Sequence, residues 1–195
     1  MNALGVMTNF ILSISSLRNA AICFLFSILI LLIFGYGVYP LLLEETGGAD
    51  ALDMVRPPTV EALNETLSHY TPRATYLYAV FSFMDSIFPL AFCASISLLW
   101  GWLFQRQSQP VLDKLIRSRI LLLPLIGGLC DVGENIGYLT MAFTGHPISE
   151  GLFTYTLYVH NAKYFLVRFS MYITPAFLIL AAIVYFRNSD AETVI

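Results

Sequence analysis

Charge is scarce in this sequence of 195 residues. Lys and Arg number 10 and Asp and Glu 13, so charged residues make up 12% of the chain, whereas a soluble domain has about 25%. Hydrophobic residues make up 57%, and the mean hydropathy is +0.73. This composition excludes an ordinary soluble domain and predicts an integral membrane protein. The formal net charge of -3 provides no basic surface, so we expect no nucleic-acid partner.

Cysteine is also rare. Cys23, Cys93 and Cys130 lie in apolar segments without C-x-x-C or Cys/His spacing, which is typical of small buried hydrophobic residues. We therefore expect neither a metal site nor a disulfide framework. The sequence contains no nucleotide-binding glycine loop, and we predict no cofactor. The length favours a single membrane domain over residues 1–195.

Four segments contain about 20 consecutive, mostly apolar residues, the length that a helix needs to cross roughly 30 Å of hydrocarbon. They predict an all-α protein, a bundle of four transmembrane helices at about 20–43, 76–104, 120–143 and 164–186. The connections are then an outer loop at 44–75, a cytoplasmic loop at 105–119 and a second outer loop at 144–163. In the first outer loop, Thr59 is a predicted N-cap of a short helix at 60–67.

The distribution of cations predicts the orientation. The connection 105–119 and the two chain ends share most of them: Arg106, Lys114, Arg117, Arg119, Arg18 and Arg187. The other two connections contain only Arg56, Arg73 and Lys163. By the positive-inside rule, both termini and the middle loop are cytoplasmic.

Polar side chains interrupt the third span in the stretch "CDVGENIGYL". At 100° per residue they share one helix face, and they are Asp131, Glu134, Asn135 and Tyr138. Gly133 and Gly137 form a G-x-x-x-G pattern on the other side, where a neighbouring helix can approach closely.

Two other spans carry matching charges. Asp85 precedes F-P in the second helix, and Arg168 lies in the fourth, preceded by His160 and Lys163. Counted from the outer ends, these groups and the acids of the third helix all fall in the outer half of the bilayer. A charged residue at the centre of a membrane helix costs about 2.5 to 3.5 kcal/mol, so we predict that they face one another.

The predicted cluster has a core, a lining and an outer mouth. The core is Asp85, Asp131, Glu134, Asn135, Tyr138 and Arg168; the lining is Ser82, Ser86, Ser170 and Tyr172; the mouth is Lys163 and His160. Unless Lys163 reaches inward, one carboxyl keeps a proton or a bound cation balances the charge. Asp131 and Glu134 are the candidate acid/base pair. The same network can instead fix the helix register, and both interpretations stay open.

Three stretches carry a resemblance: "HYTPRATYLYAVFSFMDSIFPLAF", "LLLPLIGGLCDVGENIGYL" and "HNAKYFLVRFSMY". Together they resemble uncharacterised bacterial four-helix integral membrane proteins with D-x-x-E-N in the third helix. This resemblance implies a bacterial inner-membrane location and the same clustered residues Asp85, Asp131, Glu134, Asn135 and Lys163, but no activity. A looser, architectural similarity to the sterol-isomerase and sigma-2-receptor group concerns only the packing of intramembrane acids.

Two functions remain in competition. In the first, the cluster binds a small apolar or amphiphilic, lipid-like molecule from the bilayer, with isomerase-like acid/base chemistry as an extension. In the second, the protein is a non-enzymatic component of proton- or cation-coupled transport or of membrane-complex assembly, and the cluster is structural. The sequence does not decide whether the protein is an enzyme, or whether it works alone, as a homo-oligomer or in a membrane complex.

Overall fold

The computed structural model describes residues 3–56, 58–106 and 110–192, with side chains described except at 110–112 and 184–192. All regular secondary structure in these residues is helical. The elements are, in chain order, α1 (Ala3–Ile14), α2 (Leu17–Ile33), η1 (Phe34–Val38), α3 (Tyr39–Glu45), η2 (Leu52–Met54), α4 (Val60–Ser68), α5 (Pro72–Gln105), α6 (Pro110–Arg117), η3 (Ile120–Leu122), α7 (Leu123–Thr144) and α8 (Glu150–Glu192).

Four helical segments are long and apolar enough to cross a membrane: Leu17–Glu45, Pro72–Gln105, Ile120–Thr144 and Glu150–Ile183. The predicted number of spans is therefore confirmed, and it indicates a multi-pass membrane protein. The first span continues through the π-helical turn η1 into α3. The fourth begins at Glu150 rather than near residue 164, so most of the predicted second outer loop is helical.

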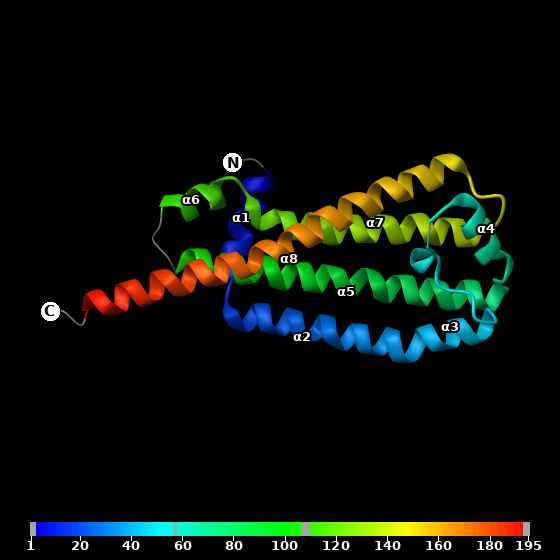
Figure 1. Cartoon of the computed structure of the whole chain (residues 1–195), viewed down its shortest axis with the longest axis horizontal. Coiled ribbons are helices and arrows are strands. Elements are labelled where there is room, and N and C mark those ends of the chain that lie inside the picture. The colour runs from blue at the N-terminus through cyan, green and yellow to red at the C-terminus, as the bar shows by residue number, and fades with distance from the viewer. Residues whose placement is uncertain (1–2, 57, 107–109, 193–195) are drawn as a thin grey trace.

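α2, α5 and α7 lie side by side in chain order, and α8 runs obliquely across α7 and α5 (Figure 1). α2 packs along α5, α5 along α7 and α7 along α8, and α8 also crosses α5 over a shorter stretch. In their most apolar windows, half of the residues of α5 and α7 are buried, against 11% in the first span and 6% in the fourth. α5 and α7 are thus the centre of the molecule, and α2 and α8 expose apolar side chains, as lipid-facing helices do.

One end of the molecule, which we call the loop end, is closed by the connection between α3 and α5 (Figure 1). The side chains of Leu42, Leu52 and Leu63 are fully buried there, in a core shared with Tyr78 of α5 and Met141 of α7. Thr59 caps α4 by accepting a hydrogen bond from the Ala62 amide, as predicted. This connection is therefore a folded cover.

The opposite end, which we call the terminal end, carries α1, α6 and the last turns of α8 (Figure 1). The Gln105 side chain donates a hydrogen bond of 2.7 Å to the Leu12 carbonyl, which ties α1 to the end of α5. Gly101 permits close packing here, because a Cβ at Gly101 would lie 2.9 Å from Ser15 Cβ. α1 is thus fixed across the ends of the long helices.

Candidate functional site

The centre of the site is an ion-paired contact between α7 and α8. Lys163 Nζ lies 2.8 Å from Asp131 Oδ1 and also contacts Glu134 Oε2. His160 Nδ1 lies 2.7 Å from Glu134 Oε1. The side chains of Asp131 and Glu134 are 4% and 1% exposed. Both carboxyl groups are therefore buried and form their ion pairs with side chains of α8.

Asn135 connects this ion-paired contact to α5. Its Nδ2 carries two N–H groups and lies within hydrogen-bond distance of three acceptors, Asp85 Oδ2 at 3.0 Å, Ser86 Oγ at 3.1 Å and Asp131 Oδ2 at 3.3 Å. The structure therefore brings together the predicted residues Asp85, Asp131, Glu134, Asn135, Lys163 and His160 in one continuous network, which we call the polar network.

Small residues on α7 bring the helices close enough for these contacts. A Cβ at Gly137 would lie 3.0 Å from Thr156 Cβ of α8, and one at Gly133 would lie 3.2 Å from Val159 Cγ1. The predicted close approach at the G-x-x-x-G pattern thus occurs against α8. The same helix also supplies Lys163, so the glycines and the acids of α7 face one neighbour rather than two.

The polar network lies near the middle of α7. At 1.5 Å per residue, Asp131 is about 12 Å from Leu123 and about 20 Å from Thr144, the two ends of the helix. Glu134 is about midway between them. These positions in the helix agree with those counted from the sequence, and the depth of the network in the bilayer stays a prediction.

Arg168 is placed differently from the expectation. Its guanidinium lies over the Tyr164 ring, 3.6 Å from the centroid, and donates a hydrogen bond to the Tyr164 hydroxyl. The Arg168 side chain is exposed, and the cation inside the network is Lys163. The two residues are five positions apart, about 140° around a helix, so they cannot share the face that meets α7.

Of the other predicted residues, Tyr138, Ser170 and Tyr172 make no hydrogen bond with any described residue of the network. Tyr138 is buried in the core of the loop end. Ser170 is buried and donates to the Leu166 carbonyl, whereas Tyr172 is 76% exposed. Tyr138 therefore belongs to the hydrophobic core, and Tyr172 faces the surroundings.

Sequence reasoning missed a fourth carboxyl, that of Asp53. η2 places it under the cover of the loop end, where the Tyr78 hydroxyl donates to Asp53 Oδ1 at 3.4 Å. Burial, together with the negative charge of Asp85, raises the pKa of Asp53 to about 7. A signal was present: Asp53 lies within "ALDMV", an apolar run in an otherwise polar loop.

A groove of about 340 Å³ lies between α5 and α7 beside the polar network. We call it the α5–α7 groove; its lining residues are Ser82, Phe83, Ser86, Ile87, Leu90, Val132, Asn135, Ile136 and Leu139. Phe83 and Ile136 are more than half exposed at its rim, so the groove opens on the lipid-facing surface. Asp131 and Glu134 do not line it.

The Ser82 hydroxyl distinguishes this groove from a simple packing defect. Ser82 is 2% exposed, and its Oγ, which is buried near the Tyr78 hydroxyl, makes no hydrogen bond of ordinary geometry among the described residues. Other helical serines, such as Ser86 and Ser95, donate to a carbonyl in their own helix. An unmade hydrogen bond of a buried group costs about 1 to 3 kcal/mol, so the groove has an unsatisfied polar position beside Asn135.

No protein-family model, curated protein or solved structure matches the chain. The resemblance to bacterial four-helix membrane proteins therefore stays a prediction, and the function is inferred from the geometry alone.

Proposed function

We propose that the protein binds a small apolar or amphiphilic molecule from the bilayer in the α5–α7 groove. The observation that carries this proposal is the unpartnered Ser82 hydroxyl in an apolar groove of about 340 Å³. Ligand pockets of this kind are mostly apolar, have volumes of about 300 to 1,000 Å³ and contain a few polar groups that fix the ligand orientation.

The lining predicts the chemistry of the ligand. Ser82 can donate or accept one hydrogen bond, while the Ser86 hydroxyl already donates to the Ser82 carbonyl and the Asn135 amide is held by carboxylates. The remaining lining is apolar. A ligand with a long or bulky hydrocarbon body and a single hydroxyl or carbonyl group matches this pattern.

Acid/base chemistry on such a ligand needs a group that titrates. Asn135 cannot exchange a proton, so it would orient the ligand. Asp85 and Asp131 each accept a hydrogen bond from Asn135, which separates them from the groove. Asp85 lies on α5 next to Ser86, and Ser86 lines the groove. Neither Asp85 nor the candidate acid/base pair Asp131 and Glu134 lines the groove. We therefore propose ligand binding there, and isomerase-like chemistry would need one of these carboxyl groups to reach the ligand directly.

A photo-crosslinking experiment tests ligand binding. The probe is a hexadecanol carrying a diazirine on its chain, added to vesicles that contain the full-length protein. We expect crosslinks at the peptides of the groove and competition by unlabelled hexadecanol but not by hexadecane.

Ser82→Ala should weaken labelling about threefold to tenfold, the value of one hydrogen bond. Ser95→Ala is the matched control, because Ser95 is buried on the same helix but donates to the Phe92 carbonyl. Equal labelling of Ser82→Ala and the unchanged protein would refute the proposal.

A second candidate function has its own observation, the mutual ion pairing of Asp131, Glu134, Lys163 and His160. A closed network of this kind fits a structural role in a transport or assembly component, in which the charges fix α8 on α7. Glu134→Gln separates the two functions. Destabilisation with unchanged hexadecanol labelling supports the structural role, whereas a stable variant with altered labelling supports a role in the ligand site.

We further propose that the terminal end faces the cytoplasm of a bacterium and that the protein lies in the inner membrane as a four-helix bundle. Arg18, Lys114 and Arg117 lie at this end and are exposed, which agrees with the positive-inside rule. Single cysteines in a cysteine-free variant test this orientation. Ser68→Cys should react with an impermeant maleimide outside spheroplasts, and Asp113→Cys should react only after lysis; the reverse pattern would refute it.

A further inference from the structure

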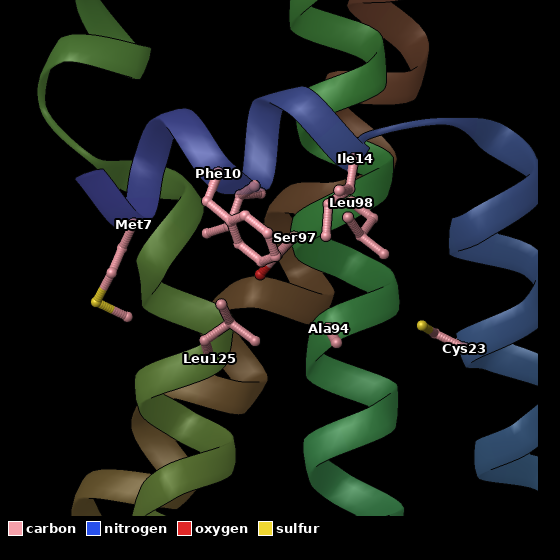
Figure 2. Close-up of a pocket in the computed structure, with 9 residues that line it drawn as sticks. Met7, Phe10, Ile14, Cys23, Ala94, Ser97, Leu98 and Leu125 are labelled. Atoms are coloured by element: carbon pink, nitrogen blue, oxygen red, sulfur yellow. The ribbon is translucent and has the colours of Figure 1, made fainter. Parts of the chain in front are cut away.

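A second crevice lies at the terminal end, far from the polar network along α5. Its volume is about 320 Å³, and it is enclosed by side chains of α1, α2, α5 and α7. Figure 2 shows Phe10 and Ile14 of α1 above it, Leu125 of α7 on one side and Cys23 of α2 on the other. We call it the α1 crevice.

One polar atom faces this apolar crevice. Ser97 is 1% exposed and lines the α1 crevice, and its Oγ has no hydrogen-bond partner among the described residues. Ser95, two positions earlier, donates to the Phe92 carbonyl at 2.6 Å. Ser97 and Ser82 are the two serines whose buried hydroxyls lack a partner in the described part of the chain, and each lines one of the two cavities.

The depth of Ser97 matches the ester groups of a phospholipid. From the contact between Ser86 and Asn135, Ser97 is about 16 Å along α5 and Leu123 about 18 Å along α7, at 1.5 Å per residue. Ser97 is therefore level with the first turn of α7. Because α7 is about 33 Å long and the hydrocarbon layer about 30 Å thick, this level is the boundary between acyl chains and headgroups.

Most of the charges described at this end are positive, although Asp113 of α6 is also exposed here. Arg18 is exposed in the first turn of α2, the helix that carries Cys23 into the crevice. Lys114 and Arg117 are exposed on α6, which packs on η3, and η3 in turn contacts α1. An anionic headgroup would therefore find complementary charge at the terminal end of the molecule.

We propose that the α1 crevice binds one acyl chain of an anionic glycerophospholipid. The chain lies against Phe10, Ala94 and Leu125, the ester carbonyl accepts a hydrogen bond from Ser97 Oγ, and the phosphate lies near Arg18. α1 acts as the wall that holds the lipid, since Gln105 fixes it to α5. This site is separate from the α5–α7 groove and does not depend on its function.

Native mass spectrometry of the full-length protein tests this site. The purified protein is mixed with equal amounts of palmitoyl-oleoyl phosphatidylglycerol and the corresponding phosphatidylcholine, and the retained lipid is counted. We expect one phosphatidylglycerol per chain, retained in preference to phosphatidylcholine. Ala94→Phe fills the crevice and should reduce retention at least tenfold, whereas Ala21→Phe, which adds the same ring at an exposed position of α2, should leave it unchanged.

Ser97→Ala is the second variant, because it keeps the packing and removes only the hydroxyl. We expect retention to fall about threefold to tenfold, as for one lost hydrogen bond, while Ser95→Ala has no effect. Arg18→Gln should remove the preference for phosphatidylglycerol. Unchanged retention in Ala94→Phe and Ser97→Ala would overturn the site, and equal retention of both lipids by the unchanged protein would overturn the assignment of an anionic headgroup.

Discussion

Lys163 of α8 lies 2.8 Å from Asp131 of α7 through its Nζ and the Oδ1 of the acid, near the middle of the span. The same ammonium group contacts Glu134. One cation thus serves two carboxyl groups that are each less than 5% exposed. Lys163 therefore contributes both to the packing of α8 on α7 and to the charge balance of the polar network.

Removal of this cation should destabilise the fold strongly. Lys163→Met leaves Asp131 and Glu134 buried without their partner, and breaking a buried ion pair from one side costs about 3 to 5 kcal/mol. Arg168→Met is the matched control on the same helix, because Arg168 is exposed and contacts Tyr164. Thermal unfolding in detergent should show a large loss for the first variant and little for the second. Equal losses would contradict the assignment of Lys163 as the internal cation.

The stability should depend on pH through Asp53. Its pKa is about 7 in the folded protein against an ordinary 3.8, so the folded state binds more protons between these values. The contribution of Asp53 to stability is then full below about pH 4 and is lost as the pH rises through about 7. Asp53→Asn should remove this part of the pH dependence of the free energy of unfolding. At pH 8 the variant should be more stable than the unchanged protein.

Chemical unfolding from pH 4 to pH 8 measures this effect as a difference between the variant and the unchanged protein. Glu61→Gln is the control, because Glu61 is exposed on α4. This substitution should leave the pH dependence of the free energy of unfolding unchanged. A parallel pH profile for Asp53→Asn and the unchanged protein would mean that Asp53 is not buried beneath the loop end.

The close contact of α7 with α8 should not tolerate a methyl group. Gly137→Ala places a Cβ 3.0 Å from Thr156 Cβ, and overpacking of this kind costs about 1 to 3 kcal/mol. At Gly35 nothing lies within 4 Å of an added Cβ, so Gly35→Ala should be neutral or stabilising by up to about 1 kcal/mol. Unfolding in detergent compares the two; a tolerated Gly137→Ala would mean that the helices are further apart.

Trp100 should link α5 to α8 near the terminal end. Its Nε1 donates a hydrogen bond of 2.9 Å to Thr174 Oγ1, and its ring meets Phe177 edge-on. A double-mutant cycle of Trp100→Phe and Thr174→Val should give a coupling energy of about 0.5 to 1.5 kcal/mol, the net value of one hydrogen bond. A coupling energy of zero would show that this contact does not form in the membrane.

Local sequence was sufficient for the spans and for much of the network. Hydrophobic length alone predicted four spans, because each span must satisfy its own backbone in lipid. The spacing of Asp131, Glu134 and Asn135 on one face predicted that they act together, and all three are less than 5% exposed. The N-cap Thr59 could also be predicted, because a cap depends on a few adjacent residues.

Other features depended on which helices meet and in which rotation. The fourth span is apolar on all sides, so no periodicity shows which face it buries. The sequence placed Arg168 in the core of the cluster and Lys163 only at its mouth. The packing of Gly133 and Gly137 against Val159 and Thr156 turns Lys163 toward the acids. Contacts between distant segments likewise place Asp53 beside Tyr78 at the loop end. They also form the α1 crevice and the α5–α7 groove, each lined by one of the two serines. The sequence by itself determined that charges must be buried together in the membrane; the tertiary structure decided which charges, because the choice lies in the rotation of one helix against another.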